Sequence, residues 1–152
     1  MRKVEDERKF LKFNYIILCM QFWRDYTPQE LESLIKKNPL TEDRVNFILQ
    51  NKIERIRFSK IATGFFITPD NGKYRILIPL QVSLEERESG LVHEISHAYY
   101  EAGGPRVSWL NPEWEKVEKI EELIDKEAQR FYKKDKEFVK QLYSRLSSQS
   151  IN

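Results

Sequence analysis

The stretch His93-Glu94-Ile95-Ser96-His97 holds both of the histidines in this 152-residue chain. It has the pattern H-E-x-x-H, in which two imidazoles four residues apart share one face of a helix. His93 and His97 can therefore bind one metal ion together. Glu94 can then reach a water molecule at that ion. The stretch predicts a metal site on a helix, and other segments of the chain must complete that site.

The sequence around this stretch predicts a helix that follows a small sheet. Residues 83–102 form the expected helix, with Ser83 as its capping residue and Gly103-Gly104-Pro105 as its stop signal. Residues 53–82 are expected to form the strands of a small antiparallel or mixed sheet. Within them, Pro69-Asp70-Asn71-Gly72 is typical of the tight turn of a hairpin.

The two ends of the chain are expected to be helical. In residues 1–52, Thr27-Pro28 and Thr41 are typical helix starts. Residues 111–147 carry apolar side chains at helical spacing. With no repeats or low-complexity linker to mark a boundary, the sequence predicts one α+β domain over residues 1–152.

The composition is that of a globular domain with a heavily charged surface. Hydrophobic residues make up 40% of the chain and charged residues 33%, and the net charge is only +2. So small a net charge argues against a dedicated binder of polyanions. The two short helices expected near residues 28–51 suggest a helix-turn-helix DNA reader, but Lys and Arg are not concentrated on the second. Nucleic acid is therefore not the expected partner.

The N-terminal sequence shows no export or membrane signal. Glu5-Asp6-Glu7 is a cluster that a signal peptide avoids, and the apolar stretch Phe10–Trp23 is too short and too interrupted to span a bilayer. The single cysteine, Cys19, lies in that apolar stretch and is interpreted as a buried small hydrophobe. Without an internal disulfide, a cytoplasmic location is expected. The sequence does not indicate an oligomeric state.

A hydrolytic zinc site needs a third protein ligand, and no further histidine exists. The remaining choice is a carboxylate, most simply one from a C-terminal helix packed beside the H-E-x-x-H helix. At 100° per residue, Glu121 and Asp125 fall together at one edge of the apolar stripe of that helix. Both are therefore candidates. The stripe consists of Val117, Ile120, Ile124, Ala128 and Phe131.

These features resemble the zincin metallopeptidases, and among them the gluzincin-like ImmA/IrrE family. That family has H-E-x-x-H on a helix after a small sheet, and then a segment E-x-E-A-N-x-F-A whose first acid binds zinc. The segment Asp125-Lys126-Glu127-Ala128-Gln129-Arg130-Phe131-Tyr132 is similar to it. Asp125 takes the ligand position, and Gln replaces the Asn. Aspartate is shorter than glutamate, so this register requires closely packed helices, which Ala128 allows.

A second register resembles the thermolysin-like E-x-x-x-D pattern. In it, Glu121 is the zinc ligand and Asp125 supports a histidine. The first register, with Asp125 as the ligand, is preferred, and Glu121 is kept as the alternative ligand. The resemblance covers about residues 64–132.

The resemblance implies a zinc-dependent metallopeptidase with one Zn²⁺ ion, a protein or peptide substrate, and Glu94 as the general base. One alternative is a zinc-binding regulatory or protein-interaction module without proteolytic activity. Another is a helical protein that binds no metal. Peptide hydrolysis also needs a donor for the developing oxyanion. The side chains available for that role are Tyr99, Tyr100, Tyr132 and Arg130.

Overall fold

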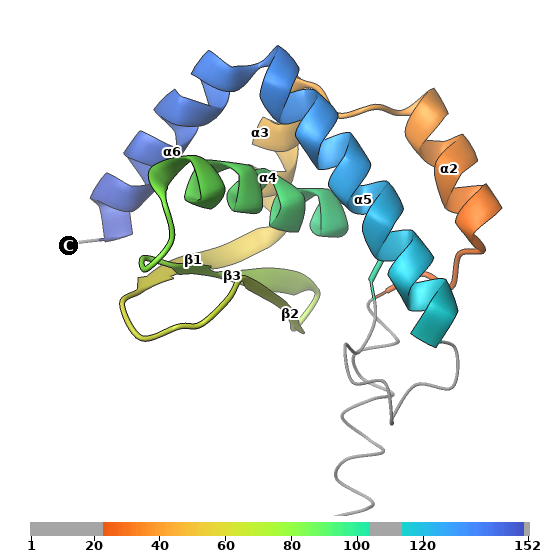
Figure 1. Ribbon diagram of the computed structural model, residues 1–152, viewed down its shortest axis with the longest axis horizontal. Coiled ribbons are helices and arrows are strands. Elements are labelled where there is room, and N and C mark those ends of the chain that lie inside the picture. Colours follow the sequence, from red (N-terminus) through yellow and green to blue (C-terminus); the bar gives the residue numbers. More distant parts are fainter. Residues whose placement is uncertain (1–22, 104–113, 151–152) are drawn as a thin grey trace, which may run out of the picture.

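The computed structural model describes residues 23–103 and 114–150, which form helices and a small sheet (Figure 1). This arrangement confirms the α+β class. In chain order the elements are α2 (Pro28–Lys37), α3 (Glu42–Asn51), β1 (Ile53–Ser59), β2 (Phe66–Asp70), β3 (Lys73–Pro79), α4 (Leu84–Tyr100), α5 (Trp114–Lys134) and α6 (Lys136–Ser150).

The helices predicted at the two ends of the chain are covered incompletely. Residues 1–22, including Cys19, lie outside the described residues, as do residues 104–113. Within the N-terminal segment predicted to be helical, residues 23–27 are not helical and α2 begins at Pro28. The C-terminal segment, predicted to be helical over residues 111–147, is seen from Trp114 as α5 and α6, and α6 continues to Ser150.

The sheet is mixed, with strand order β1-β3-β2. β2 and β3 form the predicted hairpin and run antiparallel. Asn71 and Gly72 in its turn have φ angles of 48° and 82°, which is the left-handed region that an Asn-Gly turn favours. β1 instead pairs with β3 in parallel. The chain leaves β1, forms β2 at the opposite edge of the sheet, and returns through the hairpin as β3, which lies between the other two strands.

Hydroxyl side chains begin the helices at the positions that the sequence predicts. The side chains of Thr27, Thr41 and Ser83 each accept a hydrogen bond from a backbone N–H three residues later. Such a bond satisfies one of the N–H groups that a helix leaves unpaired at its start. Ser83 thereby fixes where α4 begins, and with it the positions that the two histidines take along the helix.

The end of α4 differs from the prediction. The glycine stop signal predicted a helix to residue 102, whereas α4 ends at Tyr100 and Glu101 takes a left-handed conformation with φ of 53°. The backbone N–H of Glu101 then donates to the carbonyl of Ala98, and that of Ala102 donates to the carbonyl of His97. These bonds satisfy the last carbonyls of the helix before Gly103 is reached.

The helices lie on one face of the sheet (Figure 1). α4 packs against β3 and β2, and α5 packs along α4 on the side away from the sheet. The core between these layers is apolar and fully buried, so α4 forms the middle layer of the domain. Core side chains with 1% exposure or less include Ile76, Ile78, Leu91, Ile95, Ile124 and Phe131.

A buried carboxylate attaches the loop between α2 and α3 to α5. Glu127 is 4% exposed, and its side chain accepts a hydrogen bond of 2.7 Å from the backbone N–H of Leu40. Arg130 donates to both carboxylate oxygens of Glu127 and also to the carbonyl of Leu40 at 3.1 Å. The pair therefore satisfies both backbone groups of one loop residue.

Replacing Glu127 by alanine should destabilise the fold by about 2 kcal/mol, because the buried N–H of Leu40 loses a charged acceptor. Urea unfolding followed by circular dichroism measures the change. The exposed Glu122→Ala on the same helix is the control and should change stability by less than about 0.5 kcal/mol. Equal effects of the two changes would contradict this role of Glu127.

Candidate metal centre

Three side chains from α4 and α5 converge on one point. His93 and His97 lie one turn apart on α4, and Glu121 reaches them from α5. Nε2 of His93 is 2.6 Å from one carboxylate oxygen of Glu121, and Nε2 of His97 is 2.9 Å from the other. One ligand atom from each residue can be chosen so that all lie within 4.8 Å of one another. This group could hold a metal ion.

The ring of His97 is oriented by the end of its own helix. The side chain is almost fully buried, and its Nδ1 lies 2.6 Å from the carbonyl oxygen of Ala102. A carbonyl only accepts hydrogen bonds, so Nδ1 carries the proton and donates it. The other ring nitrogen, Nε2, then faces Glu121. The left-handed turn at Glu101 brings the Ala102 carbonyl to this position.

Asp125 contacts the other side of His93. Its carboxylate lies 3.0 Å from Nδ1 of His93, while Nε2 of the same ring faces Glu121. Asp125 is therefore not a member of the converging group, although it was the preferred third ligand on sequence grounds. Glu121, one helical turn earlier on α5, is the carboxylate in that group. Contact of Asp125 with His93 is what the second register predicts, and the identity of the third ligand stays a prediction.

Glu94 lines a cavity beside His93. It is 1% exposed, and it lines a cavity of about 910 Å³ together with His93 and Asp125. The start of β2 forms one wall and α5 forms the other. The Glu94 side chain is close enough to His93 for its charge to raise the pKa of that imidazole. A carboxylate therefore stands next to the metal-binding group and next to open space.

A glycine on α4 brings the wall of the cavity close to the helix. A Cβ atom at Gly90 would come within 2.2 Å of the ring of Phe65. The aromatic ring therefore rests directly on the backbone of α4, one turn before His93. Phe65 and Gly90 both line the cavity, so a larger residue at position 90 would displace the Phe65 ring from its wall.

Among the side chains suggested as oxyanion donors, Tyr132 lines this cavity. Its hydroxyl donates to the buried carboxyl group of Glu88 at 3.0 Å. Burial and this hydrogen bond raise the pKa of Tyr132 to about 12, so the hydroxyl keeps its proton near neutral pH. The other candidates lie elsewhere: Arg130 is bound to Glu127, and Tyr99 and Tyr100 line a separate cavity beside Asn38.

Two residues beside the site were not predicted from the sequence. Trp23 is 9% exposed, stacks on Tyr74 and places its ring edge-on to His97 at a centroid distance of 6.1 Å. Glu88 is 3% exposed and orients Tyr132. Glu88 lies among several acids at the start of α4, and no sequence pattern separates it from its exposed neighbours. Trp23 is far from the motif in sequence, so only the fold reveals its contact.

Comparison with known proteins gives no relative: no family model, no curated protein and no solved structure matches the chain. Among residues 23–103 and 114–150, no helix combines the length and the apolar character needed to cross a bilayer. The geometry of the site is therefore the basis for assigning a function.

Removing each carboxylate should distinguish a ligand from a supporting residue. Glu121→Gln should abolish stoichiometric binding of Zn²⁺, because it removes a charged group from the converging set. Asp125→Asn should bind Zn²⁺ about 10- to 100-fold more weakly, because only the support of His93 is altered. Competition with a chromophoric chelator measures both affinities. The reverse order of effects would identify Asp125 as the ligand.

Metal binding should also depend on pH through His93. Burial acts to lower the pKa of His93, but the hydrogen bonds to Glu121 and Asp125 and the charges of Glu94 and Glu121 together outweigh it. The pKa is therefore raised above its ordinary value of 6.5. Without metal, the protonated ring stabilises the fold fully below that value, and this contribution is lost as pH rises through the raised pKa.

Binding of Zn²⁺ requires the unprotonated Nε2, so it should release a proton from His93. The apparent affinity should increase as pH rises through the raised pKa and should then level off. Calorimetry in buffers of different ionisation enthalpy, between about pH 6 and 8, measures the released proton. A pH-independent affinity without proton release would show that His93 is not a ligand.

Proposed function

We propose that this chain is a zinc-dependent metallopeptidase of the gluzincin type. The observation that carries the proposal is the convergence of His93, His97 and Glu121 beside the buried Glu94 and an open cavity. The register of Glu121 and Asp125 supports a relation to the zincins through the E-x-x-x-D pattern. The cytoplasmic location inferred from cysteine usage stays a prediction.

The donor set favours zinc. Two imidazoles and one glutamate are a ligand set found in hydrolytic zinc sites, which leave a further position open. Nitrogen-rich sets suit zinc better than calcium or magnesium, which prefer oxygen ligands. Both histidines also have a hydrogen-bond acceptor at Nδ1, Asp125 for His93 and the Ala102 carbonyl for His97. Such acceptors hold metal-binding imidazoles in the required tautomer.

Glu94 and Tyr132 supply the remaining chemistry from the protein. A zinc ion bound at the site would lower the pKa of a water molecule and polarise the scissile carbonyl. Glu94 accepts a proton from the attacking water and returns it to the amine that leaves. Tyr132 lines the cavity, and its hydroxyl, which donates to Glu88 in this structure, would have to turn from Glu88 to the substrate to donate to the developing oxyanion.

The cavity suits an extended peptide. β2 is an edge strand of the sheet, and its start lines the cavity together with Gly64 and Phe65. A substrate peptide could pair with this edge by backbone hydrogen bonds and present its scissile bond to Glu94. The aromatic wall formed by Phe65 and Phe66 would favour an apolar side chain next to that bond.

Glu94→Gln should retain zinc and lose peptidase activity by about 10²- to 10⁴-fold, because the amide cannot accept a proton. The assay is digestion of a proteome-derived peptide library by the zinc-loaded protein, with products identified by mass spectrometry. The exposed Glu118→Gln on α5 is the matched control and should cleave like the wild type.

The possible results separate the hypotheses. Cleavage by wild type and not by Glu94→Gln supports the peptidase. Stoichiometric zinc without cleavage by the wild type supports the alternative, a zinc-binding module without proteolytic activity. Cleavage that survives in Glu94→Gln would refute the role given to this residue.

A further inference from the structure

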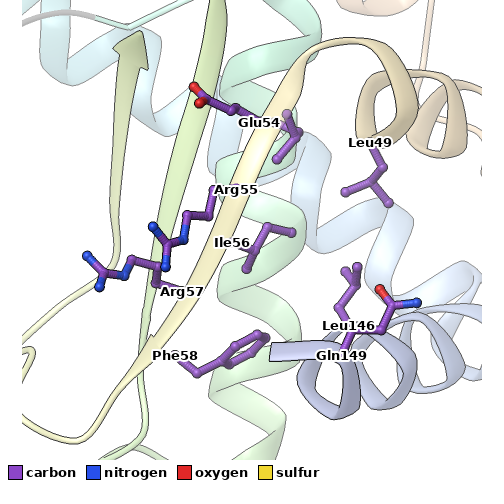
Figure 2. Close-up of a pocket in the computed structure, with 9 residues that line it drawn as sticks. Leu49, Glu54, Arg55, Ile56, Arg57, Phe58, Leu146 and Gln149 are labelled. Atoms are coloured by element: carbon purple, nitrogen blue, oxygen red, sulfur yellow. The ribbon is translucent and has the colours of Figure 1, made fainter. Parts of the chain in front are cut away.

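A second groove runs along the outer edge of β1 (Figure 2). It has a volume of about 630 Å³ and follows the strand from Ile53 to Phe58. Leu146 and Gln149 of α6 form the facing wall, and Leu49 closes one end from α3. The cavity beside His93 and Glu94 is lined by the start of β2, which lies at the opposite edge of the sheet. The two sites are therefore separate.

The side chains of β1 give this groove an apolar side and a basic side. Ile56 and Phe58 point toward the helices and the groove (Figure 2). Arg55 and Arg57 point the other way, toward the sheet face that the helices leave uncovered, and both are exposed. Among the residues that the structure describes, neither of these arginines forms an ion pair. A strand lying beside β1 would therefore meet apolar groups on one face and cations on the other.

The neighbouring arginine on β3, Arg75, differs from Arg55 and Arg57 because acidic side chains neutralise its charge. Arg75 lies beside Arg55 in the sheet and binds Asp70 at 2.8 Å and Glu54 at 3.6 Å. Glu54 and Asp70 are thus already engaged with Arg75. The positive charge of Arg55 and Arg57 is left for a partner to neutralise.

β1 also offers backbone groups for pairing. It is hydrogen-bonded to β3 on one side, and it is the edge strand of the described sheet on the other. An edge strand presents a row of N–H and C=O groups that another strand can bind. β1 extends over Ile53–Ser59 and contains no proline to interrupt such pairing.

We propose that β1 binds an extended segment of a partner protein as an additional strand of the sheet. Because neighbouring side chains of a strand alternate between faces, the segment would carry acidic residues at every second position. Those acids would lie beside Arg55 and Arg57, and the apolar residues between them would enter the groove against Phe58 and Leu146. The surface is a docking site for an acidic, alternating peptide, and it does not depend on the proposed function.

A second copy of the chain fits this edge poorly. In an antiparallel pair of β1 strands related by a two-fold axis, residues on the same face lie opposite each other. Every register that overlaps the strand centres then places Arg55 or Arg57 against an arginine of the other copy. Like charges in directly opposed positions are destabilising. The charge pattern therefore favours an acidic partner over self-association.

The test uses a short, capped, fluorescent peptide in which Glu and Val alternate, and the full chain carrying Glu94→Gln, a change that removes the proposed peptidase activity. Fluorescence anisotropy should show saturable binding. Arg55→Glu with Arg57→Glu should weaken binding by about tenfold, because attraction becomes repulsion. The same double variant should prefer a peptide in which Lys and Val alternate. Lys37→Glu with Lys140→Glu, an equal change of charge elsewhere on the surface, is the control and should bind like the parent.

Backbone N-methylation tests whether the peptide binds as a strand. Only alternate residues of an added strand direct their N–H groups to the edge that they join. Methylation of one alternate set should therefore abolish binding, and methylation of the other should leave it intact. The proposal would be overturned if the peptide still bound after methylation of either set, or if the unmethylated peptide did not bind at all. It would also be overturned if the two double variants bound the peptide equally. Tighter binding of a single-stranded oligonucleotide, or dimerisation that depends on Arg55 and Arg57, would also overturn it.

Discussion

The candidate metal centre depends on how closely α5 packs along α4. Both imidazoles come from α4, so the carboxylate has to reach them from the neighbouring helix. Ala98 on α4 and Ala128 on α5 are both 1% exposed, and small buried side chains allow helices to approach. This packing also removes water from the imidazole of His97. Ionisable groups withdrawn from water need partners, and the contacts to Glu121 and to the Ala102 carbonyl provide them.

The backbone just after the end of α4 orients the imidazole of His97. An α-helix that continued through Glu101 would direct the Ala102 carbonyl along the helix axis. The left-handed residue turns the chain back, so that this carbonyl accepts a hydrogen bond from Nδ1 of His97. Arg24 holds the same corner, since it binds both the backbone carbonyl and the carboxylate of Glu101. Backbone geometry at a helix end thereby determines which nitrogen of His97 is available to a metal ion.

Local sequence was sufficient for some features of this structure and insufficient for others. The spacing of His93 and His97 predicted their shared face because it depends on one helix alone. The choice between Glu121 and Asp125 depends on how far α5 is displaced along α4. A displacement of one turn, about 5.4 Å, would exchange the two carboxylates, and neither helix encodes that displacement by itself. For the same reason the hairpin was predictable from Asn71-Gly72, whereas the parallel pairing of β1 with β3 was not.

The strand order gives the two edges of the sheet different roles. The hairpin places β2 beside α4, where its edge faces the metal-binding group. The parallel pairing places β1 at the other edge, beside α6 and away from that group. A strand added to β1 would extend the sheet without covering Glu94 or the cavity in front of it. A partner held at β1 as proposed could therefore present a distant segment of its own chain to the cavity, because the two sites use different edges of the sheet.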